Sequence, residues 1–242
     1  MSKVNVIVIA GQSNALGISR SKELPQEKQR EYKTKIYFNT NTPHPFSKKW
    51  LNVRPGFGHA RDELFGLELP VASYLENINE EYVIVKYASD GTCLYEKWSK
   101  QKNGDDWLGL TQTLKEAIEA LQSQGKQIEF AGLLWQQGCS DAIEQEKAEK
   151  YEENLKSFIF SIRALTDEKM PVAIGSVHPV HPIMKYATQV IEAQKKTAND
   201  LENVYFVSTD GIEEVFDGWH YTPACEWELG KRLLNAIMEK KQ

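Results

Sequence analysis

The sequence lacks the patterns that would place it in a specialised class of protein. Its 242 residues include only three cysteines and no C-x-x-C pair, so neither a disulfide framework nor a zinc knuckle is indicated. There is no H-E-x-x-H and no acidic or thiol cluster with ligand spacing, so no metal is expected. Any chemistry must therefore be carried by ordinary side chains.

Long apolar runs and an excess of basic charge are also missing. No window reaches the roughly 18 apolar residues of a membrane span, and the apolar run at the N-terminus is too short for a signal peptide. The net charge of −5 and the pI of about 5.7 leave no broad basic field. We expect a cytoplasmic protein, with a phage-encoded origin left open, that has neither nucleic acid nor membrane as a partner.

The residues that are present are typical of a globular α/β protein, with 41% hydrophobic and 26% charged side chains. Runs of β-forming residues alternate with stretches whose apolar residues recur every three or four positions. This predicts one domain over residues 1–242, a flavodoxin-like three-layer α/β/α sandwich around a central, mainly parallel sheet. The expected strands are 4–9, 35–38, 82–88, 128–135, 171–177 and 204–207. The expected helices are 65–75, 106–124, 151–162, 187–198 and one that begins at 222–223.

The first expected strand ends in a turn of small polar residues. Gly11 allows a tight turn after the apolar run, and Gln12, Ser13 and Asn14 follow it. A serine hydroxyl is thus presented past the carboxyl end of a buried strand, where open α/β sheets bind ligands. Taken alone, the same serine could simply cap the next helix.

Two further expected strands end in comparable turns, D-G-T at 90–92 and Q-Q-G at 136–138. In a parallel sheet all three turns lie at the same edge. A hydroxyl, a glycine N–H and a carboxamide would then converge. Acyl transfer requires such a set, because the donors stabilise the oxyanion that forms when the nucleophile attacks.

A base for the serine is available near the C-terminus, in D-G-W-H. Asp217 precedes His220 by three residues, so its carboxylate can reach the imidazole Nδ1–H across one tight turn and leave Nε2 to face the serine. A lone D-x-x-H can equally be a loop pair without a role. His178 and His181 are weaker candidates, as residues that line a pocket.

Together these motifs resemble the SGNH hydrolase superfamily. The order G-Q-S-N, then G-T before a Leu and a Trp, then W-x-Q-G, then D-x-x-H spans nearly the whole chain. More narrowly, it is similar to the carbohydrate O-acetylesterases related to sialate O-acetylesterase and to family 6 acetylxylan esterases. No G-x-S-x-G occurs, which argues against an α/β-hydrolase elbow. The resemblance implies a cofactor-independent serine esterase that removes short acyl groups, chiefly acetyl, from sugars.

The resemblance also implies roles for particular residues. The expected catalytic residues are Ser13, Asp217 and His220. The expected oxyanion donors are the N–H groups of Ser13 and Gly91 and the side chain of Gln137. The residues expected to meet substrate, the first two of which could instead hold the turn, are Gln12, Asn14, Glu68, Asp90 and Trp98.

The chain departs from the family pattern at three positions. Asp90 replaces a glycine before Gly91, and Cys139 replaces the acid that usually follows Gln-Gly. Leu67 replaces the proline of a G-P-E element that ends at Glu68, and the resemblance implies that this element supports the site. No histidine lies near Cys139 in sequence, so Ser13 is the better nucleophile.

Two other classes of function stay open on the sequence. The chain could be an inactive relative that only binds glycans, or an SGNH lipase or thioesterase. A lipase would need a large apolar groove, whereas the chain offers aromatic and polar side chains that suit sugars better, at Trp50, Arg54, Arg61 and Trp98. The irregular loop at 39–63, which carries most of these, is either functional or an ordered surface loop.

Overall fold

The protein, seen as a computed structural model, is described over residues 2–59, 63–178, 181–212 and 214–239. Its main sheet has seven strands in the order β4-β3-β6-β1-β7-β8-β9, and every neighbouring pair is parallel except β3 with β4. The strands are β1 (Lys3–Gly11), β3 (Lys35–Asn39), β4 (Trp50–Asn52), β6 (Tyr82–Ala88), β7 (Gln127–Gln136), β8 (Val172–Gly175) and β9 (Val204–Val207). A separate antiparallel pair joins β2 (Ser19–Arg20) to β5 (Leu64–Phe65).

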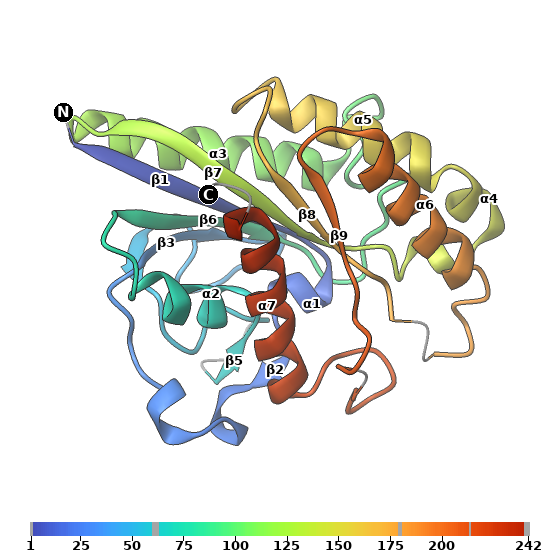
Figure 1. Ribbon diagram of the computed structural model, residues 1–242, viewed down its shortest axis with the longest axis horizontal. Helices are drawn as coiled ribbons and strands as arrows, with labels where there is room; N and C mark the ends of the chain where they lie inside the picture. Colours follow the sequence, from blue (N-terminus) through green and yellow to red (C-terminus); the bar gives the residue numbers. More distant parts are fainter. Residues whose placement is uncertain (1, 60–62, 179–180, 213, 240–242) are drawn as a thin grey trace.

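Helices cover both faces of this sheet, as Figure 1 shows: α3, α5 and α6 lie on one side, and α2 and α7 on the other. The helices are α1 (Ser13–Leu16), α2 (Glu68–Leu75), α3 (Asp105–Ser123), α4 (Gln145–Glu149), α5 (Tyr151–Arg163), α6 (Ala187–Asp200) and α7 (Pro223–Met238). The predicted three-layer α/β/α fold with a mainly parallel sheet is confirmed.

Strand β1 lies at the centre of the sheet, between β6 and β7. Val6 and Val8 pack into the core beneath α3 and α5, whereas Ile7 and Ile9 pack into the core beneath α2 and α7. Because successive side chains of a strand point to opposite faces, a strand covered on both faces must be apolar throughout. This explains the apolar run from Val6 to Ala10.

The register of the central strands brings the three polar turns to one edge. Gly11 is paired with Ala88 of β6 and with Gln136 of β7, so the three strands end at the same level. The hydrogen bonds continue past the strand ends, since Gln12 N donates to Gln136 O at 3.0 Å and Ser89 N donates to Gly11 O at 3.0 Å. The turns are therefore held against one another by backbone contacts.

The structure differs from the sequence expectation in the irregular loop, at the start of one helix and in the capping of another. Part of the loop at 39–63 forms β4, an antiparallel edge strand on β3. The helix expected from residue 65 begins at Glu68, because Phe65 pairs with Ser19 instead. Pro223 begins α7 as expected, but the Thr222 side chain makes no capping hydrogen bond.

Candidate active site

Ser13 lies where the central strand passes into a short helix. Gly11, at the end of β1, has a φ of +145°, and a Cβ there would come 2.1 Å from the Gln136 carbonyl oxygen, so the turn requires glycine. Ser13 is the first residue of α1, and a first-turn N–H has no acceptor within its own helix. The turn therefore presents a hydroxyl and a backbone donor from the same residue.

The D-G-W-H segment folds as the tight turn that its spacing predicts. Asp217 Oδ1 accepts hydrogen bonds from Trp219 N at 3.0 Å and His220 N at 2.9 Å, and Oδ2 lies 2.6 Å from His220 Nδ1. Partial burial raises the pKa of Asp217, but these hydrogen bonds outweigh burial and the net pKa is lowered. An ionised carboxylate on Nδ1 favours the tautomer in which Nε2 can accept a proton.

Asn14 connects the serine turn to the histidine turn, which lie more than 200 residues apart in sequence. Its Nδ2 donates to Trp219 O at 3.2 Å, and its Oδ1 accepts from Tyr221 N at 3.4 Å. These two backbone groups flank His220 on either side. The structure therefore brings the Asp217–His220 turn against the residue next to Ser13, and Asn14 is a buried link between the two turns rather than an exposed contact for substrate.

Two histidines that follow β8 pack against the histidine turn. The ring of His181 stacks on Trp219 with centroids 4.1 Å apart, and the ring of His178 stacks on Tyr221 at 6.0 Å. Both histidines thus pack on neighbours of His220. They brace the turn that carries the imidazole.

The turn after β6 presents Gly91 at the same edge. Gly91 has a φ of +66°, and the space around its Cα is open. Beneath it, Thr92 Oγ1 donates to Ser89 O at 3.0 Å and accepts from Trp98 Nε1 at 2.9 Å. Asp90 is exposed at the tip of this turn. The tip is open to a ligand while its base is fixed by hydrogen bonds.

Gln137 does not have the free amide that an oxyanion donor needs. Its Nε2 donates to Thr92 O at 3.0 Å and to Asp141 Oδ2 at 2.7 Å, and its Oε1 accepts from Tyr151 at 3.1 Å. An amide nitrogen has two protons, and both are used here. Gln137 therefore holds the turns after β6 and β7 together, and the sequence expectation for its side chain does not fit this geometry.

Asp141 is a buried acceptor that the sequence reading missed. Besides Gln137, its carboxylate accepts hydrogen bonds from Leu94 N at 2.8 Å and Tyr95 N at 3.0 Å. Burial raises its pKa to about 6, although the hydrogen bonds act in the opposite direction. Asp141 thus fixes the segment that follows Gly91. Nothing in its sequence neighbourhood distinguished it from an ordinary loop acid.

Gln12 has a similar role on the neighbouring turn. Its Oε1 accepts hydrogen bonds from Gly138 N at 3.0 Å and Ser140 N at 3.4 Å. The side chain therefore ties the serine turn to the loop after β7. This matches the first of the two roles that the sequence left open for Gln12, that of holding the turn.

Glu68 was expected to meet substrate, and the structure contradicts this. Its side chain is fully buried, with Oε2 2.5 Å from Lys86 Nζ and Oε1 accepting from Gly66 N at 3.0 Å. Lys86 Nζ also donates to Leu16 O at 2.6 Å and Phe57 O at 3.0 Å. A carboxylate engaged in this way has no surface for a sugar. Instead the pair supports the end of α1, the helix that Ser13 begins.

A second buried acid, Glu226 on α7, lies near the Glu68–Lys86 pair. Burial, and then the nearby negative charge of Glu68, raise the pKa of Glu226 well above its usual range, which favours its neutral form. Burial lowers the pKa of Lys86, and Glu68 acts against this. The sequence did carry a signal, since a lysine inside the apolar run Y-V-I-V-K-Y-A needs a buried partner.

Trp98 was also expected to meet substrate, and the structure places it elsewhere. It is fully buried, and its ring packs edge-on against Trp135 with centroids 5.1 Å apart, so it belongs to the core rather than to a substrate site. Trp50 lies in β4 against Tyr37, and Arg54 covers the ring of Phe46. Arg61 lies outside the described residues.

Cys139 lies beside the site but is unsuited to act as a nucleophile. Only 7% of the residue is exposed, and burial raises the pKa of its thiol to about 12. Because the thiolate is the reactive form, a thiol with this pKa is inert near neutral pH. Ser13 remains the better candidate.

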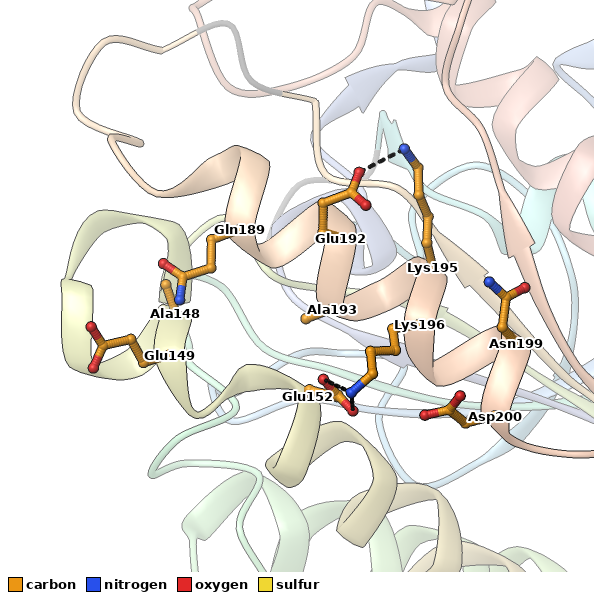
Figure 2. A pocket seen from close by; sticks show the side chains of 10 residues that line it. All are labelled: Ala148, Glu149, Glu152, Gln189, Glu192, Ala193, Lys195, Lys196, Asn199 and Asp200. Atoms are coloured by element: carbon orange, nitrogen blue, oxygen red, sulfur yellow. Dashed lines mark hydrogen bonds and ion pairs between the residues drawn. The ribbon is translucent and has the colours of Figure 1, made fainter.

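Figure 2 shows a cavity of about 470 Å³ away from this edge, between α4, the start of α5 and α6. Its charged side chains largely pair with one another, as Lys196 does with Glu152 and Lys195 with Glu192. None of its lining residues comes from the strand-end turns.

Over the part of the chain that the structure describes, no group of three or more His, Cys, Asp or Glu side chains could hold a metal. Within that same part, no helix is long and apolar enough to cross a membrane.

A mainly parallel α/β/α sheet with a serine on the first strand-to-helix turn, and an Asp–His pair near the end of the chain, is the arrangement expected from the resemblance to SGNH hydrolases. The sequence matches the family described as carbohydrate esterase, sialic acid-specific acetylesterase, over residues 3–239. The chain belongs to this family of carbohydrate esterases. The resemblance drawn from the motifs is thereby confirmed.

Solved structures show the same fold. A protein from Arabidopsis thaliana aligns with a TM-score of 0.79 at 18% identity, covering 97% of this chain and 98% of its own. NanS aligns with a TM-score of 0.72 at 15% identity, covering 100% and 99%. A carbohydrate acetylesterase from Xanthomonas citri aligns with a TM-score of 0.65 at 18% identity, covering 97% and 55%. Among curated proteins no sequence matches.

Proposed function

We propose that this chain is a serine esterase that removes acetyl groups from carbohydrate hydroxyls through an acyl-Ser13 intermediate. The bridge made by Asn14 is the observation that supports this most. It ties the residue beside Ser13 to the backbone on both sides of His220, whose Nδ1 is held by Asp217. A nucleophile, a base and a group that orients the base are the parts that acyl transfer needs.

In the first half of the reaction, Ser13 Oγ attacks the ester carbonyl carbon while His220 Nε2 takes the hydroxyl proton. The carbonyl electron pair moves to oxygen, and the N–H groups of Ser13 and Gly91 stabilise the oxyanion. His220 then returns the proton to the sugar oxygen as the carbon–oxygen bond breaks. The deacetylated sugar leaves, and Ser13 carries the acetyl group.

In the second half, water takes the place of the sugar. His220 accepts a proton from the water as its oxygen attacks the acetyl carbon, and then gives the proton back to Ser13 Oγ. Acetate and the free enzyme result. No step needs a cofactor, since the proton moves only between His220 and the reacting oxygens.

Acetyl esters of carbohydrates are the substrate class that the family and one neighbour support. The family description names carbohydrate esterases and a sialic acid-specific acetylesterase, and the Xanthomonas citri structure is described as a carbohydrate acetylesterase.

Hydrolysis of 4-nitrophenyl acetate by Ser13→Ala and by Ser123→Ala tests the proposal. Ser123 lies at the exposed end of α3 and serves as the matched control. We expect Ser13→Ala to lose at least about a thousandfold in kcat/KM with an unchanged circular dichroism spectrum, and Ser123→Ala to keep full activity. A fluorophosphonate probe should label wild type and not Ser13→Ala. Full activity in Ser13→Ala would refute the proposal, and a preference for octanoyl over acetyl esters would refute its acyl-chain part.

A further inference from the structure

The tip of the turn after β6 carries a charge beside the candidate site. Asp90 immediately precedes Gly91, and its side chain is 46% exposed. The base of the turn is held by Ser89 N on Gly11 O and by the hydrogen bonds of Thr92. Because the backbone of the turn is held in this way, the Asp90 carboxylate remains close to any ligand bound at Gly91.

His59 approaches Asp90 from a different element. Its backbone N donates to Gly17 O at 2.8 Å, and Gly17 is the C-cap residue that follows α1, the helix begun by Ser13. Its Nε2 lies 3.9 Å from Asp90 Oδ2, which is too long for a hydrogen bond. The two side chains thus approach each other beside the turn that carries Gly91, and the Asp90 carboxylate keeps much of its exposure.

Within the part of the chain that the structure describes, His59 is the one basic side chain that lies within ion-pair distance of Asp90. No lysine or arginine there forms an ion pair with Asp90. The other carboxylate of the site, Asp217, is already engaged by His220. A substrate that carries its own carboxylate next to the scissile ester would therefore meet a like charge beside Gly91.

We propose that Asp90, placed beside Gly91 and adjoined by His59, makes the site discriminate against anionic substrates and favour acetyl esters of neutral or amino sugars. This inference rests on the proposed esterase function and specifies its substrate class. Two like charges 6–8 Å apart near a protein surface reduce binding of the transition state by about 3- to 30-fold. An amino sugar, which is cationic, would gain from the same charge.

Small aryl acetates that differ in one charge isolate this effect. The pair is methyl 4-acetoxybenzoate, which is neutral, and 4-acetoxybenzoate, which carries a carboxylate on the leaving group. The quantity measured is the ratio of their kcat/KM values. Comparing that ratio between variants cancels the different intrinsic reactivities of the two esters.

We expect the ratio of kcat/KM for the neutral ester to kcat/KM for the anionic ester to be highest in wild type. It should be about 3- to 30-fold lower in Asp90→Asn and lower still in Asp90→Lys. The difference should shrink in 0.5 M NaCl, because salt screens exposed charges. Asp167→Asn is the matched control, since Asp167 is an exposed acid in the segment before β8, at the far edge of the sheet. Its ratio should equal that of wild type.

The outcomes separate the inference from the function on which it rests. Equal ratios in wild type, Asp90→Asn and Asp90→Lys, with both esters hydrolysed, would overturn the charge selection and leave the esterase proposal standing. No hydrolysis of either ester by wild type would overturn both. A fall in Asp167→Asn as large as in Asp90→Asn would show that net charge, not the position of Asp90, is responsible, and would also overturn the inference.

Discussion

Asp217 Oδ2 lies 2.6 Å from His220 Nδ1, and the other oxygen of the same carboxylate accepts the backbone N–H of His220. One carboxylate thus holds both the ring and the main chain of the candidate base. Asp217→Asn would place an amide on Nδ1, which permits the wrong tautomer, and we expect kcat to fall roughly 10²- to 10⁴-fold. Asp210→Asn, which changes an exposed acid in the segment after β9, should leave kcat unchanged. Equal activity in the two variants would remove Asp217 from the site.

The bridge made by Asn14 leads to a prediction about geometry rather than chemistry. Asn14→Ala removes both hydrogen bonds to the histidine turn, so we expect kcat to fall at least about tenfold, with a smaller change in KM. Stability should fall by about 1–2 kcal/mol for the two hydrogen bonds lost. Steady-state kinetics and urea unfolding measure the two effects.

Asn39→Ala provides the comparison for this variant. Asn39 donates one hydrogen bond, to Thr113 Oγ1 at 3.1 Å, on the far side of β6 from β1. It should lose stability without a loss of kcat. If both asparagine variants lose kcat in proportion to their stability, the bridge has no specific part in positioning His220.

The contrast between what the sequence predicted and what it did not has a physical basis. The apolar run of β1 and the small residues after each strand are local signals, because burial on both faces and a tight turn each demand particular residue types. They led to the fold and to Ser13. The spacing of Asp217 and His220 is local too, and their turn forms as expected.

The errors concern side chains whose partners are distant in sequence. Glu68 and Trp98 follow motifs that suggested contact with substrate, but one pairs with Lys86 and the other enters the core. The amide of Gln137 is taken by Thr92 and Asp141, which lie on separate loops. Such competition for a hydrogen-bonding group depends on the packed structure and has no counterpart in residue spacing.

The buried Lys86–Glu68 pair predicts a large stability effect. Lys86→Met would leave the Glu68 carboxylate buried without its counter-charge, and we expect a loss of about 3–5 kcal/mol in the free energy of unfolding. The double variant Lys86→Met/Glu68→Gln should recover part of this loss, since it removes the uncompensated charge. Chemical denaturation of the three proteins measures both values. A double variant less stable than Lys86→Met would show that hydrogen bonds to the backbone, not charge pairing, dominate at this position.

The burial of Cys139 predicts that the thiol is dispensable and unreactive. With its pKa raised to about 12, hardly any thiolate forms at pH 8, so iodoacetamide should not modify Cys139 until the protein is unfolded. Cys139→Ala should keep kcat/KM within a few-fold of wild type. Mass spectrometry of the native and the urea-treated protein locates the modified residue. Rapid native alkylation at Cys139 together with loss of activity would instead reopen the question of which side chain is the nucleophile.

Asp141 predicts a pH dependence of stability with a definite sign. Burial raises its pKa from 3.8 to about 6, so between these values the folded protein binds a proton that the unfolded chain has released. Stability from this group is therefore complete well below the unfolded pKa of 3.8 and is lost as the pH rises through 6. By linkage the change amounts to roughly 3 kcal/mol. In Asp141→Asn this dependence is absent, so the difference in unfolding free energy between wild type and variant should shift by about 2 kcal/mol from pH 4 to pH 6.5, in favour of the variant.

Comparison with the variant isolates Asp141 from the other buried acids. Glu226 also has a raised pKa, but it is present in both proteins and its contribution cancels in the difference. Asp141→Asn disturbs the hydrogen bonds that Asp141 accepts from Leu94 and Tyr95, so the variant should be less stable at every pH. This loss lowers the free energy of unfolding by a constant amount and adds no pH dependence. Asn39→Ala, which changes no titratable group, should differ from wild type by a constant amount over the same range. A constant difference for Asp141→Asn as well would mean that Asp141 titrates alike in the folded and unfolded protein.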